Sequence, residues 1–120
     1  MRIAILGALS SKEVNNRTPS KVVVDYLQNV HEMCRAASIV RKKGHVPFTP
    51  VLDLLLGVVG DDWEEEDYRG LTTEFIKVCE AVVVISRSWG VERDLETARQ
   101  YKCIIYNSLE EVPDVKEGLC

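Results

Sequence analysis

The sequence predicts an α/β fold in which a parallel sheet of four to five strands carries helices on both faces, as a single domain over residues 1–120. Two observations lead to this prediction. Short apolar runs alternate with longer segments whose apolar residues recur every three or four positions, as strands alternating with helices do. The apolar runs, above all "AVVVIS", are continuous, which is typical of parallel strands covered on both faces. The pattern indicates a three-layer arrangement of the flavodoxin or Rossmann-like type.

The strands and helices follow one another in a readable order. Four apolar runs are expected to be strands, and they cover residues 2–7, 45–50, 81–86 and 103–107. A long helix is expected within 19–44, because apolar residues there step by three or four and basic residues precede Gly44. Its stepped residues are Val23, Leu27, Val30, Cys34, Ala37 and Val40 or Arg41.

The remaining segments are expected to be helical or irregular. Residues 51–59 are ambiguous and favour a short helix. The acidic connector 60–70 leads into a helix over 71–80, and the alternative is that the connector itself begins this helix, with Asp61 or Asp62 as the cap. A further helix is expected to start near Gly90, and the last residues predict a tail or terminal turn.

The composition and charge of the chain indicate which classes of binding partner are unfavourable. The chain is 46% hydrophobic and 28% charged, which is typical of a globular domain, and its net charge of −4 comes without a basic block. That balance argues against a nucleic-acid polymer as partner. No run of 18 apolar residues is present, so we expect no membrane contact and a cytoplasmic location. The cysteines and histidines lack ligand spacing, so we expect free thiols and no metal site.

Two loops are expected to form a ligand site. In parallel sheets ligands bind beyond the carboxyl ends of the strands, at the point where the strand order reverses. This rule selects the loop after the first strand and residues 86–90 after the third. The residues of the first loop are Gly7, Ala8, Leu9 and Ser10. Asp53, just past the second strand, would lie at the same edge.

The segment "SWGVERDLETA" carries three acids at alternate positions, and helical phase separates them. At ~100° per residue, Val91, Leu95, Ala98 and Tyr101 fall on the side that faces the sheet. Asp94 falls on that inward side, whereas Glu92 and Glu96 fall on the opposite half and are expected to be solvated. An inward acid is costly unless it is paired or lines a wet cleft. We expect the helix amino terminus to lower the pKa of Asp94 and keep it ionised, with capping of backbone N–H groups as the alternative role.

The same segment resembles the Ser-x-Gly-x-x-x-Glu-x-x-x-Ala motif of the nucleoside 2-deoxyribosyltransferase superfamily, which includes the 2'-deoxynucleoside 5'-monophosphate N-glycosidases. The resemblance extends over most of the chain. "RIAILGALSS" resembles the family's first strand and loop, "GHVPFTP" its second strand, "FIKVCEAVVVI" the approach to the catalytic loop, and "KCIIY" its last strand.

The resemblance implies cleavage of the N-glycosidic bond of a nucleoside or its 5'-monophosphate, with no cofactor. In this family a carboxylate attacks the anomeric carbon, and water or a second base then takes the sugar. The position of the nucleophile falls on Asp94, and Ser88 and Gly90 would hold the sugar or its phosphate, with backbone N–H groups of the first loop beside them. Trp89 would stack on a base or serve as a packing or dimer contact. The resemblance also implies a homo-oligomer, a dimer or tetramer.

Two departures from the family pattern leave alternatives open. The usual nucleophile is Glu, so Glu92 or Glu96 could replace Asp94, or the chain could bind a nucleotide without cleaving it. Relatives also carry an Asp on the preceding helix, where this chain has Leu71-Thr72-Thr73-Glu74. Glu74 and Asp67 are the candidate replacements.

Overall fold

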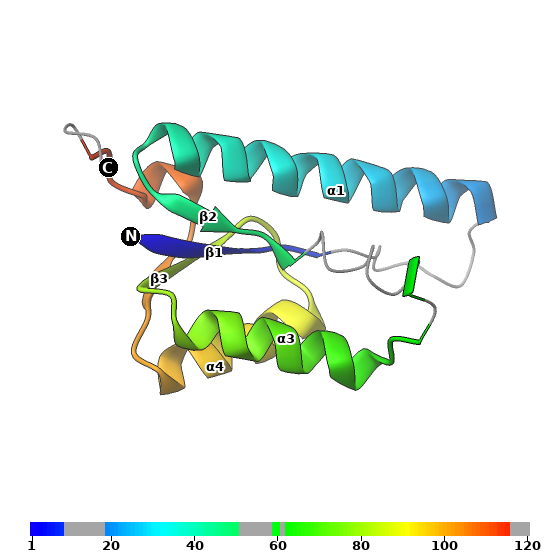
Figure 1. The fold of residues 1–120 in the computed structure, drawn as a ribbon. Helices are drawn as coiled ribbons and strands as arrows, with labels where there is room; N and C mark the ends of the chain where they lie inside the picture. Colours follow the sequence, from blue (N-terminus) through cyan, green and yellow to red (C-terminus); the bar gives the residue numbers. More distant parts are fainter. Residues whose placement is uncertain (9–18, 51–58, 61, 116–120) are drawn as a thin grey trace.

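A computed structural model describes residues 1–8, 19–50, 59–60 and 62–115, and it shows a parallel sheet between two layers of helix (Figure 1). The predicted α/β fold is therefore confirmed, with four strands in the described part of the chain. The elements are β1 (Arg2–Leu6), α1 (Pro19–Lys42), β2 (Val46–Phe48), α3 (Glu65–Lys77), β3 (Ala81–Val84), α4 (Trp89–Gln100), β4 (Ile104–Tyr106) and the short 3-10 helix η2 (Leu109–Glu111).

The sheet has the order β2-β1-β3-β4, and each neighbouring pair is parallel. Ile3 of β1 is aligned with Pro47 of β2 on one side and with Ala81 of β3 on the other. The chain thus moves outward from β1 to β2 and then crosses back to β3. The strand order reverses between β1 and β3, so the carboxyl ends of these two strands flank the switch point at which such sheets bind ligands.

Alternate residues of β1 face two separate cores, because successive side chains of a strand point to opposite faces. Ile3 and Ile5 lie with α1, whereas Ala4 and Leu6 lie with α3 and α4. The helix residues in the first core are Met33, Ala36 and Val40, and those in the second include Ile76, Val91, Leu95 and Ala98. Figure 1 shows the same division, with α1 on one side of the sheet and α3 and α4 on the other.

Burial along α1 does not follow the apolar stripe read from the sequence. Met33 and Val40 are buried, but Val23 and Leu27 are 56% and 58% exposed. The physical reason is helical phase, because Leu27 lies roughly 120–140° around the helix axis from Met33 and Val40 and therefore faces away from the sheet. The first half of α1 also extends past the carboxyl ends of the strands (Figure 1).

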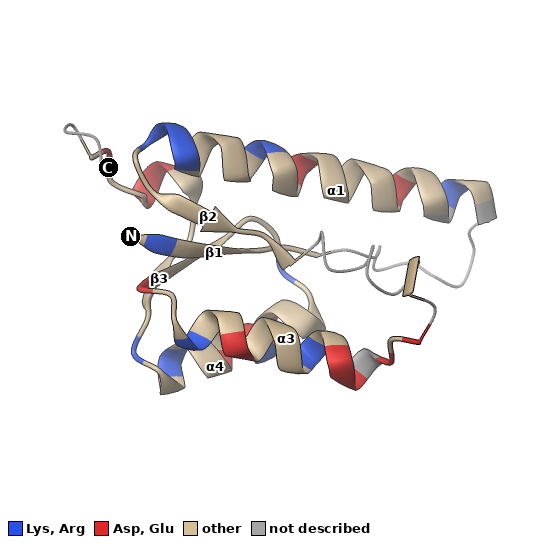
Figure 2. Cartoon of the chain, viewed as in Figure 1, with Lys and Arg blue, Asp and Glu red and all other residues tan. Residues whose placement is uncertain are grey.

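The start of α3 also differs from the expected cap. The helix begins at Glu65 with Glu64 as its N-cap, and the backbone N–H of Glu64 donates to the Asp67 carboxylate at 2.8 Å. Asp62 is therefore not the cap, and Asp61 lies outside the described residues. The reciprocal capping box explains why the acidic connector becomes helical, because acids in a first turn satisfy and complement its N–H groups. Figure 2 shows these acids gathered at the start of α3 and basic residues at the end of α1.

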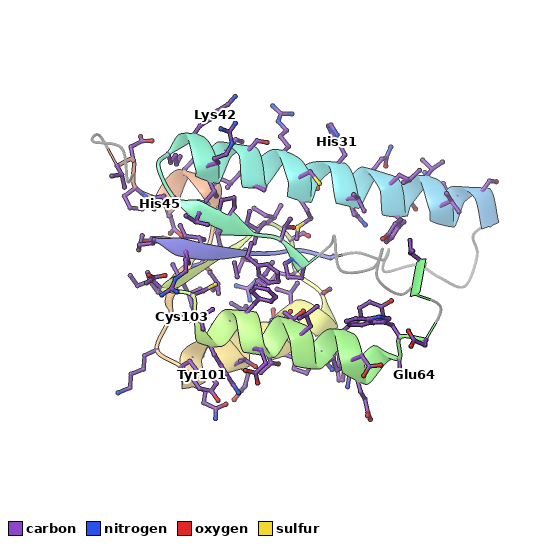
Figure 3. The ribbon with its side chains drawn as sticks, in the orientation of Figure 1. His31, Lys42, His45, Glu64, Tyr101 and Cys103 are labelled. Atoms are coloured by element: carbon purple, nitrogen blue, oxygen red, sulfur yellow. The ribbon has the colours of Figure 1, made fainter. Side chains whose placement is uncertain are left out.

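The last described residues are tied to the end of α1. The Lys43 ammonium donates to the carbonyl oxygens of Leu109 and Val112, each at 2.8 Å. His45, labelled in Figure 3, lies 2.7 Å from the Pro113 carbonyl through Nε2. A carbonyl only accepts, so Nε2 carries the proton and His45 has a structural role. No described helix has the length and apolar character needed to cross a bilayer.

Candidate functional site

The loops after β1 and β3 meet at the switch point. The backbone N–H of Ala8 donates a 2.8 Å hydrogen bond to the hydroxyl of Ser86. A Cβ on Gly7 would lie 2.3 Å from the Met33 sulfur and 3.3 Å from the Ser86 hydroxyl. A side chain at position 7 would therefore force Met33 to move, and the N–H of Ala8 is used inside the protein. Leu9, Ser10 and Asp53 lie outside the described residues.

Ser86 lies in the loop 86–90 that the switch-point rule selects, but sequence reasoning gave it no role of its own. It lies two residues after the end of β3 and, with Ala8, joins the two loops. Its position directly after a continuous apolar run was the available signal, but its partner lies 78 residues away and no local pattern reveals that contact.

Helix α4 begins at Trp89, close to the start near Gly90 that the sequence predicts. Ser88 is the N-cap, and its hydroxyl accepts a 3.2 Å hydrogen bond from the backbone N–H of Val91. A Cβ on Gly90 would meet nothing closer than the Ser88 hydroxyl, at 3.9 Å. Packing within the described chain therefore does not require glycine at position 90.

Trp89 lies on the outer side of α4. Its side chain is 78% exposed, and the Arg93 guanidinium lies 5.3 Å from the ring centroid. This pair faces away from the buried side of the helix, which carries Val91 and Leu95. Trp89 and Asp94 therefore point in different directions, and stacking of Trp89 on a base bound at Asp94 stays a prediction.

The three acids of α4 have the environments that helical phase predicts. Glu92 is exposed and forms an ion pair with Arg87 at 2.7 Å, and Glu96 is exposed as well. Asp94 is half-buried, next to the buried residues Val91, Leu95 and Ala98. Tyr101 does not share their burial, because it is the C-cap of α4 and is 43% exposed, with the Lys77 ammonium over its ring (Figure 3).

The pKa of Asp94 is raised, which corrects the expectation that the helix terminus would lower it. Burial of the carboxyl raises its pKa from 3.8 to about 6, and the positive charge of Arg93 offsets part of this effect. The helix begins at Trp89, so Asp94 lies in the second turn and not in the first. The helix dipole acts mainly within the first turn, and desolvation therefore dominates.

Asp94 forms no hydrogen bond or ion pair with the residues that the structure describes, although the neighbouring acid Glu92 has one. Capping of backbone N–H groups is thus not its role, since Ser88 performs that at the α4 terminus. A half-buried carboxyl with a raised pKa and no such contact is a candidate for a functional group.

The residues of α3 offer weaker candidates. Glu74 is exposed and bonded to Lys77 at 2.8 Å, and Asp67 is used in the capping box. Both line an open groove of about 540 Å³ along α3, together with Asp62, Trp63, Glu66, Gly70 and Leu71. Thr72 is the buried polar residue of this stretch, at 8% exposure. The structure thus gives Glu74 and Asp67 partners of their own and brings neither into hydrogen bonding with Asp94.

Metal binding finds no support in the described part of the chain, where no group of three His, Cys, Asp or Glu side chains could hold an ion. Cys34, Cys79 and Cys103 are free thiols, as predicted. Burial raises the pKa of Cys79 to about 11, which makes it a poor nucleophile. Comparison of the chain with protein-family models, curated proteins and solved structures found no match.

Proposed function

We propose that this chain cleaves the N-glycosidic bond of a deoxynucleoside or its 5'-monophosphate in the cytoplasm, with Asp94 as nucleophile. The observation that carries the proposal is the environment of Asp94. Its half-buried carboxyl lies on the helix that follows β3, one of the two strands at the switch point. The resemblance of "SWGVERDLETA" to the family motif selects the same residue independently of its burial.

The proposed reaction needs Asp94 in its ionised form. The carboxylate attacks the anomeric carbon, the carbon–nitrogen bond breaks, and its electron pair leaves on the base nitrogen as that nitrogen takes a proton. Water then attacks the same carbon, loses a proton and releases the sugar and the carboxylate. With a pKa of about 6, Asp94 is ionised by about ten to one at pH 7.

Partial burial favours this chemistry over a purely structural role. A carboxylate surrounded by apolar side chains is poorly solvated, which makes its attack on a developing cation more favourable than it would be in water. The ion pair of Glu92 with Arg87 and the exposure of Glu96 make these two acids weaker candidates.

Incubation of the purified chain with a panel of deoxynucleosides and their 5'-monophosphates tests the proposal, with free base measured by chromatography. We expect release that falls by about 10³-fold or more in Asp94→Ala and persists in Glu92→Ala and Glu96→Ala. Asp94→Glu restores the length of the usual nucleophile in the family, and we expect it to keep or increase the release.

The second candidate function is nucleotide binding without cleavage, which the shorter Asp94 side chain and Thr72 in place of an acid favour. In that case no base is released, but a nucleotide raises the melting temperature of the wild-type chain. Absence of both base release and thermal shift would contradict both candidates.

A further inference from the structure

Two free thiols lie together at the edge of the sheet opposite the candidate site. Cys79 lies two residues before β3, and Cys103 directly precedes β4, the strand beside β3. Both residues belong to the core under α3 and α4, Cys79 as a buried member and Cys103 packed against it. Figure 3 shows Cys103 at this amino-terminal edge of the sheet.

The thiol of Cys103 already contacts the residue Cys79. Its Sγ donates weak hydrogen bonds to the carbonyl oxygens of Cys79 at 3.3 Å and Ile76 at 3.6 Å. The two backbones also lie side by side, because the N–H of Ile104 donates to the Glu80 carbonyl at 3.0 Å. Adjacent strands lie ~4.8 Å apart, and disulfides span Cα–Cα distances of about 4.4–6.8 Å. Neighbouring positions on adjacent strands, as Cys79 and Cys103 are, are therefore within bridging distance.

The electrostatics of the two thiols also indicate that the sulfurs are close. Burial raises the pKa of Cys79 to about 11, and the negative charge of a Cys103 thiolate adds to the rise. Burial likewise raises the pKa of Cys103, and the charge of Glu80 contributes. Both groups are therefore thiols at neutral pH, and neither reacts quickly on its own.

We propose that Cys79 and Cys103 form a reversible disulfide when the chain meets hydrogen peroxide, and that this bond ties together the turns that follow α3 and α4. Cys103 is the thiol that reacts first, because it is partly exposed whereas Cys79 is only 9% exposed. Disulfides of this kind, in reducing compartments, are transient and respond to oxidants.

The reaction takes place in two steps. The Cys103 sulfur attacks one oxygen of hydrogen peroxide, the O–O bond breaks, and the second oxygen leaves as water with the thiol proton, so that Cys103 becomes a sulfenic acid. The Cys79 sulfur then attacks the Cys103 sulfur, the S–O bond breaks, and the hydroxyl leaves as water with the Cys79 proton. Two electrons pass from the sulfurs to the peroxide. Proximity of the two residues compensates for the low reactivity of the Cys79 thiol.

The bond would close residues 79–103 into a loop that contains β3 and α4. A disulfide stabilises a protein mainly because it restricts the unfolded chain. We therefore expect the melting temperature of the oxidised chain to rise by roughly 10 °C. This redox response does not depend on the proposed cleavage reaction.

Peroxide treatment of the reduced chain tests the proposal, with the remaining thiols trapped by N-ethylmaleimide and the chain digested by trypsin without reductant. Cleavage after Lys77, Arg87 and Lys102 puts the two cysteines in separate peptides, 78–87 and 103–116. We expect mass spectrometry to find these peptides joined, two hydrogens lighter than their sum, in a chain that still migrates at 13.6 kDa without reductant. Dithiothreitol should separate the peptides and remove the gain in melting temperature.

Cys34→Ser is the matched control, because Cys34 packs against the other core, and it should keep both the joined peptides and the gain. Cys103→Ser and Cys79→Ala should lose both. Cys79 is the more buried of the two, so Cys103→Ser decides the test if Cys79→Ala does not fold. Peptides joined through Cys34 or Cys120, oxidation of Cys103 to a sulfinic acid without a bridge, or an unchanged melting temperature in the bridged chain would overturn the proposal.

Discussion

The hydroxyl of Ser86 accepts a 2.8 Å hydrogen bond from the backbone N–H of Ala8 and so joins the ends of β3 and β1, across 78 residues of sequence. These two strands flank the switch point of the sheet. The bond therefore holds in place the two loops between which a ligand is expected to bind.

Removal of this hydroxyl should destabilise the chain. In Ser86→Ala the partly buried N–H of Ala8 loses its partner, and we expect the free energy of unfolding to fall by about 1 kcal/mol. Urea denaturation measures the change. Ser108→Ala is a suitable control, because Ser108 precedes η2 without making a side-chain cap bond, and it should change stability little. Equal losses in the two variants would contradict the role given to Ser86.

Substitution of Gly7 should disturb the core beside the same loops. The Cβ of Gly7→Ala would lie 2.3 Å from the Met33 sulfur, and Met33 is only 3% exposed. We expect a loss of roughly 1–3 kcal/mol, because a packed side chain must move. Gly70→Ala, on α3 with no described atom within 4 Å of the new Cβ, should instead stabilise by about 0.5–1 kcal/mol. A neutral Gly7→Ala in thermal denaturation would show that Met33 adjusts freely.

Asp94 should lower the stability of the folded chain at neutral pH. Its pKa rises from 3.8 to about 6 on folding, so the folded chain holds the proton more tightly, and stability falls as pH rises through that window. A shift of this size corresponds to about 3 kcal/mol, which partial exposure reduces, so Asp94→Asn should stabilise by about 1–2 kcal/mol at pH 7.

The pH dependence of the stabilisation by Asp94→Asn tests whether burial of the ionised carboxylate causes it. Near pH 4 both Asp94 and its Asn replacement are neutral in the folded chain, so the two melting temperatures should converge. Glu96→Gln, at an exposed position of the same helix, should have little effect at either pH. A stabilisation by Asp94→Asn that is equal at pH 4 and pH 7 would contradict the assignment.

We expect Gly90 to be needed for base release from the substrate but not for the stability of the fold. A Cβ at this position would meet no described atom closer than the Ser88 hydroxyl, at 3.9 Å, and alanine favours a helix over glycine by about 0.5–1 kcal/mol. We therefore expect Gly90→Ala to keep or increase stability but to weaken base release, because the methyl group would occupy the path of the sugar or its phosphate. Unchanged kinetics in this variant would show that the ligand does not approach Gly90.

The local sequence pattern was sufficient to predict the strands and α4. The continuous runs at β1 and β3 predicted strands covered on both faces, and both cores contain their residues. Helical phase correctly predicted that Asp94 is half-buried and that Glu92 and Glu96 are exposed. The prediction worked because only one narrow side of α4, which includes Val91 and Leu95, packs against the rest of the protein.

Other features depend on contacts that no local pattern contains. The stripe of α1 could not be assigned from sequence because apolar residues lie on two sides of this helix, and only its packing on the sheet decides which side is buried. The raised pKa of Asp94 depends on how far the packing of the helices removes water from its carboxyl. The bond between Ser86 and Ala8 depends on the strand order.

The most direct test of the central claim is mass spectrometry of the chain quenched with acid during turnover of a deoxynucleoside or its 5'-monophosphate. A carboxylate nucleophile forms a covalent glycosyl-enzyme, so we predict a deoxyribosyl adduct on the peptide that contains Asp94, absent in Asp94→Ala. An adduct on Glu92, Glu96 or Glu74, or base release that persists at the wild-type rate in Asp94→Ala, would contradict the assignment of Asp94 as the nucleophile.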